Sequence, residues 1–157
     1  MNDLQQTVAE LSRRVQALED ELAIHRLIVQ YGFGVDIGDA DRAAEVFTED
    51  AVYDTDVGVM HGHTGVRGMV LGARHQAMVG SCAHQIGPAV VELHGDRAVA
   101  TGYSRVYVRT DDTIRIYRVS FNHWELERRD GRWQVARRTT RLLGHPDAKR
   151  IFETDGF

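Results

Sequence analysis

Apolar residues recur every third or fourth position at the start of the chain, over residues 2–22. They form two series spaced by sevens, Leu4, Leu11 and Leu18 in one and Val8, Val15 and Leu22 in the other. Charged residues and glutamines occupy most of the positions between them. A heptad of this kind predicts an amphipathic helix with an apolar seam. Two interpretations stay open: the seam lies on the helix's own domain, or it packs on a neighbouring subunit.

Helical signals continue through the rest of the first half of the chain. The expected helices cover residues 21–37, about 39–47 and 65–78, with a short strand over 51–57 and a loop over 58–65. Gly38 supplies a stop for the first of these helices. Asp39 or Asp41 can cap the second helix, and Thr64 can cap the third.

From Ala83 the apolar period changes to two, which is typical of half-buried strands. The four expected strands cover about 83–93, 97–109, 114–128 and 132–143. Short hairpin connections separate them, and Asp130-Gly131 is a particularly good turn dipeptide. Consecutive hairpins predict a curved, antiparallel, meandering sheet, and helices that precede strands predict an α+β fold. About three N-terminal helices wrapped around such a sheet leave a pocket between the layers, where we expect the chemistry.

Length and composition add a few limits. A chain of 157 residues with 43% apolar and 27% charged residues suits one globular domain over 1–157. Within it, residues 1–20 form the heptad helix and residues 144–157 a polar tail. The net charge of −4 argues against a nucleic-acid partner, and no apolar run approaches the length of a membrane span. Cys82 is the single cysteine, so no internal disulfide is possible and a cytoplasmic location is expected.

Asp36 and His84 are the candidates for proton chemistry. Asp36 lies where the first long helix is expected to end, between Val35 and Ile37. The negative end of the helix dipole and the apolar neighbours both disfavour a charged carboxylate there, as suits a general base or its partner. His84 opens the first long strand, and an imidazole gains or loses a proton near neutral pH. A carboxylate beside it would fix its tautomer and stabilise the imidazolium.

Other polar residues fit simpler roles. His61 and His63 could bind a divalent ion together with a nearby aspartate, but the surrounding glycines favour solvated loop histidines. Cys82 shares a strand face with His84 and reads as a small buried side chain rather than a nucleophile. We expect the remaining histidines on the surface or in strands: His75, His94, His123 and His145. We expect the tryptophans in the core or the pocket wall: Trp124 and Trp133.

Several segments, taken in order, form one wider pattern. They are residues 31–36 (YGFGVD), 44–47 (AEVF), 50–53 (DAVY), the glycine-rich stretch before the third helix, the strand opening at His84, and residues 129–133 (RDGRW). Their order and spacing resemble the SnoaL-like branch of the nuclear transport factor 2-like superfamily, over about residues 18–143. The resemblance implies a cone-shaped α+β barrel. The enzymes it is most similar to are bile acid 7α-dehydratase, hexachlorocyclohexane dehydrochlorinase and scytalone dehydratase, which are eliminating lyases.

The resemblance implies a catalytic dyad of Asp36 and His84 assisted by Tyr31, without a metal or a cofactor. It implies substrate contacts at Tyr53, Phe47, Arg138 and Arg141. Strand alternation puts Arg138 and Arg141 on opposite faces, so at most one of them faces the pocket, and solvent exposure is the ordinary expectation for either. The implied partners are a small apolar substrate and further copies of the chain, with a trimer favoured over a dimer.

The resulting hypothesis is a cofactor-independent lyase of the dehydratase type. The dehydrochlorinase pattern has a basic residue and a tryptophan where this chain has Tyr31 and Tyr53, so loss of water fits better than loss of halide. A ketosteroid-isomerase-like isomerase or a polyketide cyclase is the near alternative, because only the later path of the proton differs. A non-catalytic binding or assembly module and a ring-hydroxylating oxygenase subunit would share the same fold.

Overall fold

The computed structural model describes residues 3–153. Its elements are α1 (Asp3–Asp36), α2 (Ala40–Glu45), β1 (Phe47–Thr55), β2 (Gly58–His61), α3 (Gly62–Leu71), α4 (Ala73–Gln76), β3 (Cys82–His94), β4 (Arg97–Thr110), β5 (Thr113–Arg129), β6 (Arg132–Leu142) and the 3-10 helix η1 (Ala148–Phe152). The expected α+β order of helices before long strands is confirmed. Within this part of the chain, no helix has the length and apolar character that crossing a lipid bilayer requires.

Six strands form one curved, mixed sheet in the order β2-β1-β6-β5-β4-β3. The four strands β3 to β6 form the predicted antiparallel meander. β1 runs parallel to β6, with Tyr53 beside Arg138, so the expectation of a purely antiparallel sheet is wrong. Alternation within a strand shows which residues share a face. It carries no information about the direction of a partner strand that lies some eighty residues away.

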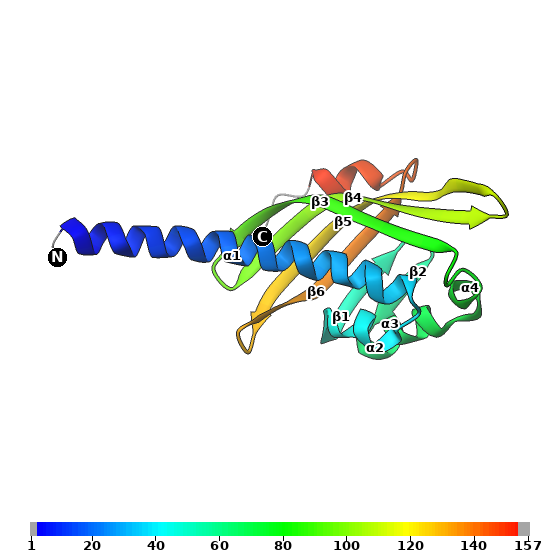
Figure 1. The fold of residues 1–157 in the computed structure, drawn as a ribbon, viewed down its shortest axis with the longest axis horizontal. Helices are drawn as coiled ribbons and strands as arrows, with labels where there is room; N and C mark the ends of the chain where they lie inside the picture. Colours follow the sequence, from blue (N-terminus) through cyan, green and yellow to red (C-terminus); the bar gives the residue numbers. More distant parts are fainter. Residues whose placement is uncertain (1–2, 154–157) are drawn as a thin grey trace.

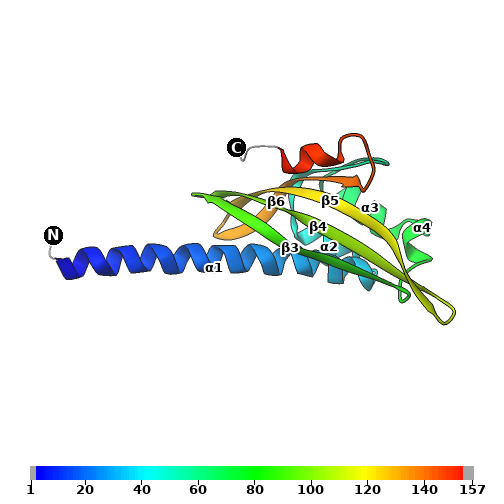
Figure 2. The same cartoon turned by 90° about the horizontal axis from the view of Figure 1, so that it is seen from above.

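The helices lie on one face of the sheet and η1 lies on the other (Figure 1, Figure 2). α1 packs mainly against β3, and α3 packs against β1 and α2. The core between these layers contains Ile28, Phe47, Val70, Trp124 and Val135, each at most 2% exposed. Trp124 therefore lies in the core, as predicted.

α1 is one uninterrupted helix of 34 residues, so the two helical segments predicted at the start of the chain join. Its inner half packs on the sheet, with Ile24, Ile28 and Val35 at most 2% exposed. Its outer half extends beyond the strands (Figure 2), and the six heptad residues are 49–67% exposed. The interpretation in which the heptad seam lies on the helix's own domain is therefore wrong.

Asp20 marks the place where α1 meets the sheet. Its carboxylate accepts hydrogen bonds from Arg128 Nη2 at 2.7 Å, from Trp133 Nε1 at 3.1 Å and from Gln16 Nε2 at 3.1 Å. Burial acts to raise the pKa of Asp20, but these hydrogen bonds outweigh burial and hold the pKa below its ordinary value. The hairpin end of β5 and β6 thus fixes the middle of α1 through an ionised carboxylate.

The segment between β1 and α3 differs from the prediction. Part of the expected loop forms the edge strand β2, in which Val59 pairs with Asp54 of β1. α3 begins at Gly62, so Thr64 lies inside the helix and does not cap it. An edge strand of only four residues has little alternation of its own, and only its pairing with β1 identifies it.

The other helix ends follow their signals more closely. Asp39 caps α2, because its side chain accepts a hydrogen bond from the backbone N–H of Arg42 at 3.0 Å. α2 ends at Glu45, and β1 begins at Phe47, earlier than expected. The helix predicted over 65–78 is split into α3 and α4 because Gly72 adopts an extended conformation.

The tail is ordered where it contacts the outer face of the sheet. Phe152 of η1 stacks on Phe121 with ring centroids 4.8 Å apart, and it meets Tyr103 edge-on at 5.2 Å. Ile151 is 5% exposed. The apolar residues of the polar tail therefore serve to dock it on β4 and β5. Residues 154–157 of the predicted tail lie outside the described residues.

Candidate active site

Asp36 and His84 come together where α1 ends and β3 begins. His84 Nδ1 lies 2.6 Å from Asp36 Oδ1, and the backbone N–H of His84 donates to Asp36 Oδ2 at 2.8 Å. Both side chains are mostly buried, with 18% of His84 and 17% of Asp36 exposed. An ionised carboxylate only accepts hydrogen bonds, so Nδ1 carries the proton and Nε2 is left as the basic nitrogen. This contact fixes both the tautomer and the ring orientation of His84.

Two glycines of α1 allow this arrangement. A Cβ on Gly32 would lie 3.2 Å from the carbonyl oxygen of His84, and a Cβ on Gly34 would lie 2.9 Å from the amide nitrogen of Ala43. α1 therefore approaches β3 and α2 with bare backbone, closer than a side chain would permit. The first of these approaches lets Asp36 reach both the backbone and the ring of His84.

His84 faces a small cavity between the helices and the sheet, with a volume of about 100 Å³. Tyr31, Tyr53 and Arg138 lie in its wall, as the resemblance implies. A second, more apolar hollow of about 280 Å³ continues outward over β2. The two hollows share four lining residues, Tyr53, Met69, Arg118 and Thr140. A polar inner chamber that opens into an apolar outer hollow suits a ligand with an apolar body and a polar reacting end.

Tyr31 supplies a hydroxyl in this wall. Its ring stands edge to face against Tyr53, with centroids 6.3 Å apart, and Tyr31 is 2% exposed. Burial raises the pKa of Tyr31 far above its ordinary value, and Tyr53 acts in the same direction while Arg138 acts against it. The Tyr31 hydroxyl therefore keeps its proton at neutral pH and acts as a hydrogen-bond donor rather than a base.

Arg138 is buried, 4% exposed, so the ordinary expectation of a solvent-exposed arginine is wrong for this residue. Its guanidinium carbon lies 4.0 Å from the ring centroid of Trp124, 4.6 Å from that of Tyr53 and 4.8 Å from that of Tyr31. Cation–π contacts of this kind stabilise a guanidinium that has left water. Arg138 forms no ion pair within residues 3–153, where its buried Nη1 atom also lacks a hydrogen-bond partner. A buried cation with a free donor beside a cavity is equipped to meet negative charge on a ligand.

Asn122 holds Arg138 in place. Its Oδ1 accepts hydrogen bonds from Arg138 Nη2 at 2.7 Å and from Arg138 Nε at 3.2 Å. Its Nδ2 donates to Ser104 Oγ at 2.9 Å, and Asn122 is fully buried. Sequence reasoning missed this residue. The inward side of β5 holds the polar Ser120 as well as Trp124, so alternation alone gave no signal that Asn122 is buried.

His75 is the second histidine of the cavity wall, and sequence reasoning placed it wrongly on the surface or in a strand. It lies in α4, is 9% exposed, and its ring centroid is 6.2 Å from that of His84. Its Nε2 donates to the backbone carbonyl of Val35 at 2.7 Å. This carbonyl lies in the last turn of α1 and also accepts the backbone N–H of Gly38 at 3.1 Å. His75 therefore ties α4 to the turn of α1 that carries Asp36.

Cys82 completes a group with Asp36 and His84, whose ligand atoms lie within 4.8 Å of one another, as a metal site would require. Its Sγ lies 3.6 Å from Asp36 Oδ1. Burial, and then the negative charge of Asp36, raise the pKa of Cys82 to about 11. These contacts favour a protonated thiol that donates to Asp36 over a thiolate ligand or nucleophile.

Two implied substrate contacts lie elsewhere. Arg141 is on the opposite face of β6, where Nη1 pairs with Asp54 Oδ1 at 3.0 Å. The alternation argument therefore holds, and Arg138 is the arginine that faces the cavity. Phe47 is fully buried behind Tyr31 and Tyr53, at 5.5 and 5.9 Å between ring centroids, and it does not line the cavity. Its role is to back the aromatic wall, so the expected substrate contact is wrong.

The two histidines of the H-x-H pair, His61 and His63, lie at the junction of β2 and α3. His61 ends β2, and His63 lies in the first turn of α3, where its Nε2 donates to the carbonyl of Phe47 at 2.8 Å. His63 therefore ties α3 to β1 instead of lying in solvent as a loop residue.

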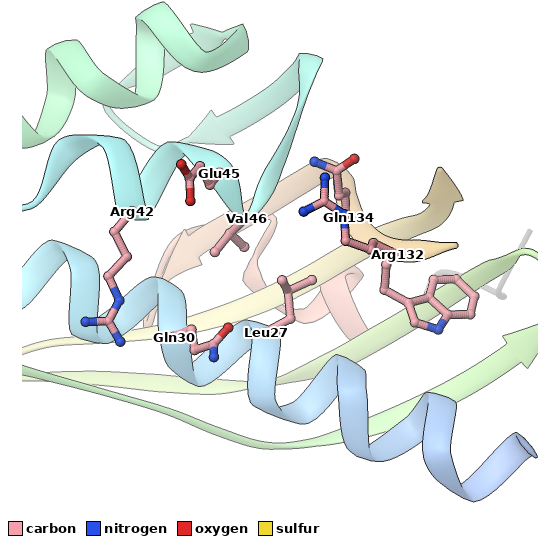
Figure 3. Close-up of a pocket in the computed structure, with 8 residues that line it drawn as sticks. Leu27, Gln30, Arg42, Glu45, Val46, Arg132 and Gln134 are labelled. Atoms are coloured by element: carbon pink, nitrogen blue, oxygen red, sulfur yellow. The ribbon is translucent and has the colours of Figure 1, made fainter. Parts of the chain in front are cut away.

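A separate hollow of about 350 Å³ lies where α1, α2 and the start of β6 meet (Figure 3). The side chains labelled there are Leu27, Gln30, Arg42, Glu45, Val46, Arg132 and Gln134. Its charged residues are exposed to solvent, and neither a histidine nor a cysteine lines it. This lining has the character of a solvated surface recess, so the candidate site remains the cavity beside His84.

Comparison with known proteins gives the family of the chain. The family model of the SnoaL-like domain matches residues 16–139. The chain belongs to this family. The resemblance stated from the sequence is therefore confirmed, and so is the cone-shaped α+β fold it implies.

Solved structures of SnoaL-like and related proteins give the same fold. An NTF2-like protein with a cystatin-like fold from Novosphingobium aromaticivorans DSM is 33% identical, with a TM-score of 0.89, and the alignment covers 98% of this chain and 99% of that one. A hexachlorocyclohexane dehydrochlorinase from Novosphingobium barchaimii LL02 is 20% identical, with a TM-score of 0.71 and coverage of 82% and 90%. A provisional scytalone dehydratase from Novosphingobium aromaticivorans DSM 12444 is 17% identical, with a TM-score of 0.70 and coverage of 80% and 85%. No curated protein matches the chain in sequence.

Proposed function

We propose that this SnoaL-like protein is a cofactor-independent lyase that removes water from a small, largely apolar hydroxy-carbonyl compound. The observation that carries the proposal is the Asp36–His84 pair, whose 2.6 Å contact leaves a basic Nε2 beside a small cavity with Tyr31, Tyr53 and Arg138 in its wall. A general base needs this combination of fixed tautomer and limited water access. A protein that only binds a ligand has no need of it.

The proposed reaction begins with the carbon–hydrogen bond next to the substrate carbonyl. His84 Nε2 takes that proton, and Asp36 stabilises the imidazolium that forms. The electron pair of the broken bond moves onto the carbonyl oxygen as an enolate, and Arg138 Nη1 and the Tyr31 hydroxyl are the donors available to it. When the enolate collapses, the carbon–oxygen bond on the next carbon breaks. The proton held by His84 leaves with that hydroxyl, so the products are a conjugated alkene and water.

The hollow next to the cavity supports an apolar substrate. Val57, Val59 and Met60 line it, and it joins the inner chamber at Tyr53 and Met69. An inner volume of about 100 Å³ holds only the reacting end of a ring compound, so the remainder would rest on β2. The distant dehydrochlorinase and the provisional scytalone dehydratase have names of the same reaction class, which is consistent with elimination but does not identify the substrate.

The test is a screen of cyclic β-hydroxy ketones, followed by the absorbance of the new conjugated alkene. His84→Ala and Asp36→Asn should each lower turnover by at least about a hundredfold, because they remove the base and the group that orients it. His94→Ala is the matched control, since His94 is exposed and lies at the far end of the same strand. Its turnover should equal that of the wild type.

The same screen distinguishes the alternatives. Exchange of the α-hydrogen for deuterium with a shifted double bond and no loss of water would indicate an isomerase. Tight binding without exchange or elimination, or His84→Ala with wild-type turnover, would remove the lyase proposal and leave a binding module.

A further inference from the structure

The outer half of α1 presents an apolar seam that its own domain does not cover. The outer part of α1 extends beyond the sheet (Figure 1). Six heptad residues that share one side of the helix by their spacing are each about half to two-thirds exposed: Leu4, Val8, Leu11, Val15, Leu18 and Leu22. Val29, 39% exposed, continues the seam inward at the same spacing of seven. Apolar area of this extent on an otherwise polar helix marks an interaction surface.

The side-chain types in the seam favour two strands. Leu4, Leu11 and Leu18 occupy one series of heptad positions, d, while the other series, a, holds Val8, Val15, Leu22 and Val29, of which three are β-branched. β-branched residues at a with leucine at d favour a parallel two-stranded coiled coil over three or four strands. The expectation of a trimer came only from the resemblance, and this pattern points to a dimer instead.

The charges that flank the seam fit a second copy of the same helix. In a parallel two-stranded coil, each g residue faces the e residue five positions further along the other helix. Arg14 at g would face the partner's Glu19, and Glu21 at g would face the partner's Arg26. Each pair occurs twice in a symmetric dimer, and each joins opposite charges. In residues 3–153, Arg14 and Glu19 form no ion pair with their own chain, so both are available.

Two further features fit a second copy of α1 as the partner of the seam. The buried residues of the inner half, Ile24, Ile28 and Val35, lie on the side of α1 away from Leu22 and Val29, so two helices can meet without their domains colliding. Because the domain fixes the inner half, the outer half continues a helix that is already nucleated, which removes the main cost of a short coiled coil. A lipid surface fits poorly, because residues 3–22 carry five acidic side chains against two arginines, whereas interfacial helices are rich in Lys and Arg.

We propose that two copies of this chain associate through a parallel coiled coil of their α1 helices, with Leu4 to Val29 as the seam and Arg14–Glu19 and Glu21–Arg26 as the interchain ion pairs. The domains then lie on opposite sides of one end of the coil. The proposal is independent of the reaction at His84, since it uses residues of the opposite side of α1.

Sedimentation equilibrium of the full chain provides the first test, and a concentration-dependent monomer–dimer equilibrium is expected. Leu11→Glu places a charge in the seam and should weaken the dimer at least about a hundredfold. Because Leu11 is exposed in the single chain, this variant keeps the fold, which its circular dichroism spectrum and melting curve will check. Arg13→Glu changes a side chain on the other side of the helix, 74% exposed, and should leave the dimer intact.

A charge exchange tests the pairing itself. Arg14→Glu and Glu19→Arg each create like-charge contacts and should weaken the homodimer about tenfold. The double variant restores opposite charges and should regain wild-type affinity. An equimolar mixture of the two single variants should form heterodimers in preference to either homodimer, as native mass spectrometry will show.

Orientation is tested by cross-linking. Leu4→Cys should give a disulfide-linked dimer under mild oxidation, because in a parallel coil the two d residues face each other. Gln6→Cys, on the outer side of the helix, is the control and should cross-link poorly. A wild-type monomer at all concentrations, a trimer, a dimer that survives Leu11→Glu, or equal cross-linking at both cysteines would each overturn the proposal.

Discussion

The two halves of α1 differ in whether the rest of the chain covers their apolar side. The inner half buries Ile24, Ile28 and Val35 at a spacing of four or seven, and its side chains are covered by the sheet. The outer half carries a strict heptad, and every apolar residue in it is about half exposed or more. Both halves are amphipathic with nearly the same period. Their difference lies only in whether the rest of the chain supplies a surface opposite the apolar side.

Asp20 stands at the boundary between the two halves. Arg128 of β5 and Trp133 of β6 donate to Asp20 itself, and α1 packs mainly against β3. Figure 2 shows the outer part of α1 extending beyond the strands. Gly32 and Gly34 lie in the inner half, and they let it approach β3 and α2 closely enough for Asp36 to bond His84. The inner half is therefore where packing and chemistry are coupled, and the outer half is free for assembly.

The largest expected difference between the halves is in folding stability. Ile28→Ala should lower the free energy of unfolding by about 2–5 kcal/mol, because it leaves a cavity in the fully packed core. Leu11→Ala should lower it by less than about 0.5 kcal/mol in the single chain, because the side chain is already half in solvent. Urea unfolding at a protein concentration low enough to keep the chain monomeric will measure both. Equal losses would show that the outer half packs on the domain after all.

The boundary itself can be tested by titration. Asp20→Asn should lower the free energy of unfolding by about 1–2 kcal/mol at pH 7, because a charged acceptor for Arg128 and Trp133 becomes neutral. The pKa of Asp20 is lowered in the folded state, so its contribution is fully present above the unfolded value of 3.8 and is lost as the pH falls through the folded value. The difference in the free energy of unfolding between the variant and the wild type should therefore disappear below about pH 4.

Asp96→Asn is the matched control for Asp20. Asp96 pairs with the same Arg128 at 3.0 Å but its side chain is 81% exposed. This change should cost less than about 0.5 kcal/mol. If both variants cost the same at pH 7, the burial of Asp20 contributes nothing to holding α1.

At Gly32 two effects on stability oppose each other, while the effect on the site should still be clear. Gly32→Ala gains about 1 kcal/mol of helix propensity but forces the carbonyl of His84 to move, so the net change in stability should stay within about 1 kcal/mol. The shift should lengthen the Asp36–His84 contact, seen as an upfield change in the Nδ1 proton resonance, and should reduce turnover about tenfold. Gly68→Ala, with no atom within 4 Å of the added Cβ, should change neither.

The fold follows from the sequence wherever a signal is local. Alternation and turn dipeptides such as Asp130-Gly131 set the four long strands to within a few residues, and the stop at Gly38 set the end of α1. The parallel pairing of β1 with β6 and the short strand β2 could not be predicted in this way. Both depend on backbone pairing with a strand elsewhere in the fold, which leaves little trace in the pattern of side chains.

Some residues of the candidate site could likewise be predicted from the sequence, and others could not. The places of Asp36 and His84 at a helix end and a strand start indicated them as candidates, the resemblance implied that they form a dyad, and the structure brings their side chains together. His75 and Asn122 were missed, because nothing near them in sequence distinguishes a buried histidine or amide from an exposed one. Phe47 was placed in the pocket although it lies behind Tyr31 and Tyr53, since a buried aromatic residue at the start of β1 looks the same in sequence as one that lines the cavity.

By itself, the amino-acid sequence determined the long first helix, the four-stranded meander, the glycines before Asp36 and the seam from Leu4 to Leu22. Only the tertiary structure decided which side of α1 is covered, whether Arg138 or Arg141 contacts the aromatic rings, and that His75 lies beside His84. Periodicity is a property of neighbours along the chain. Burial is the sum of contacts from every element that reaches a residue, and it exists only once those elements have packed.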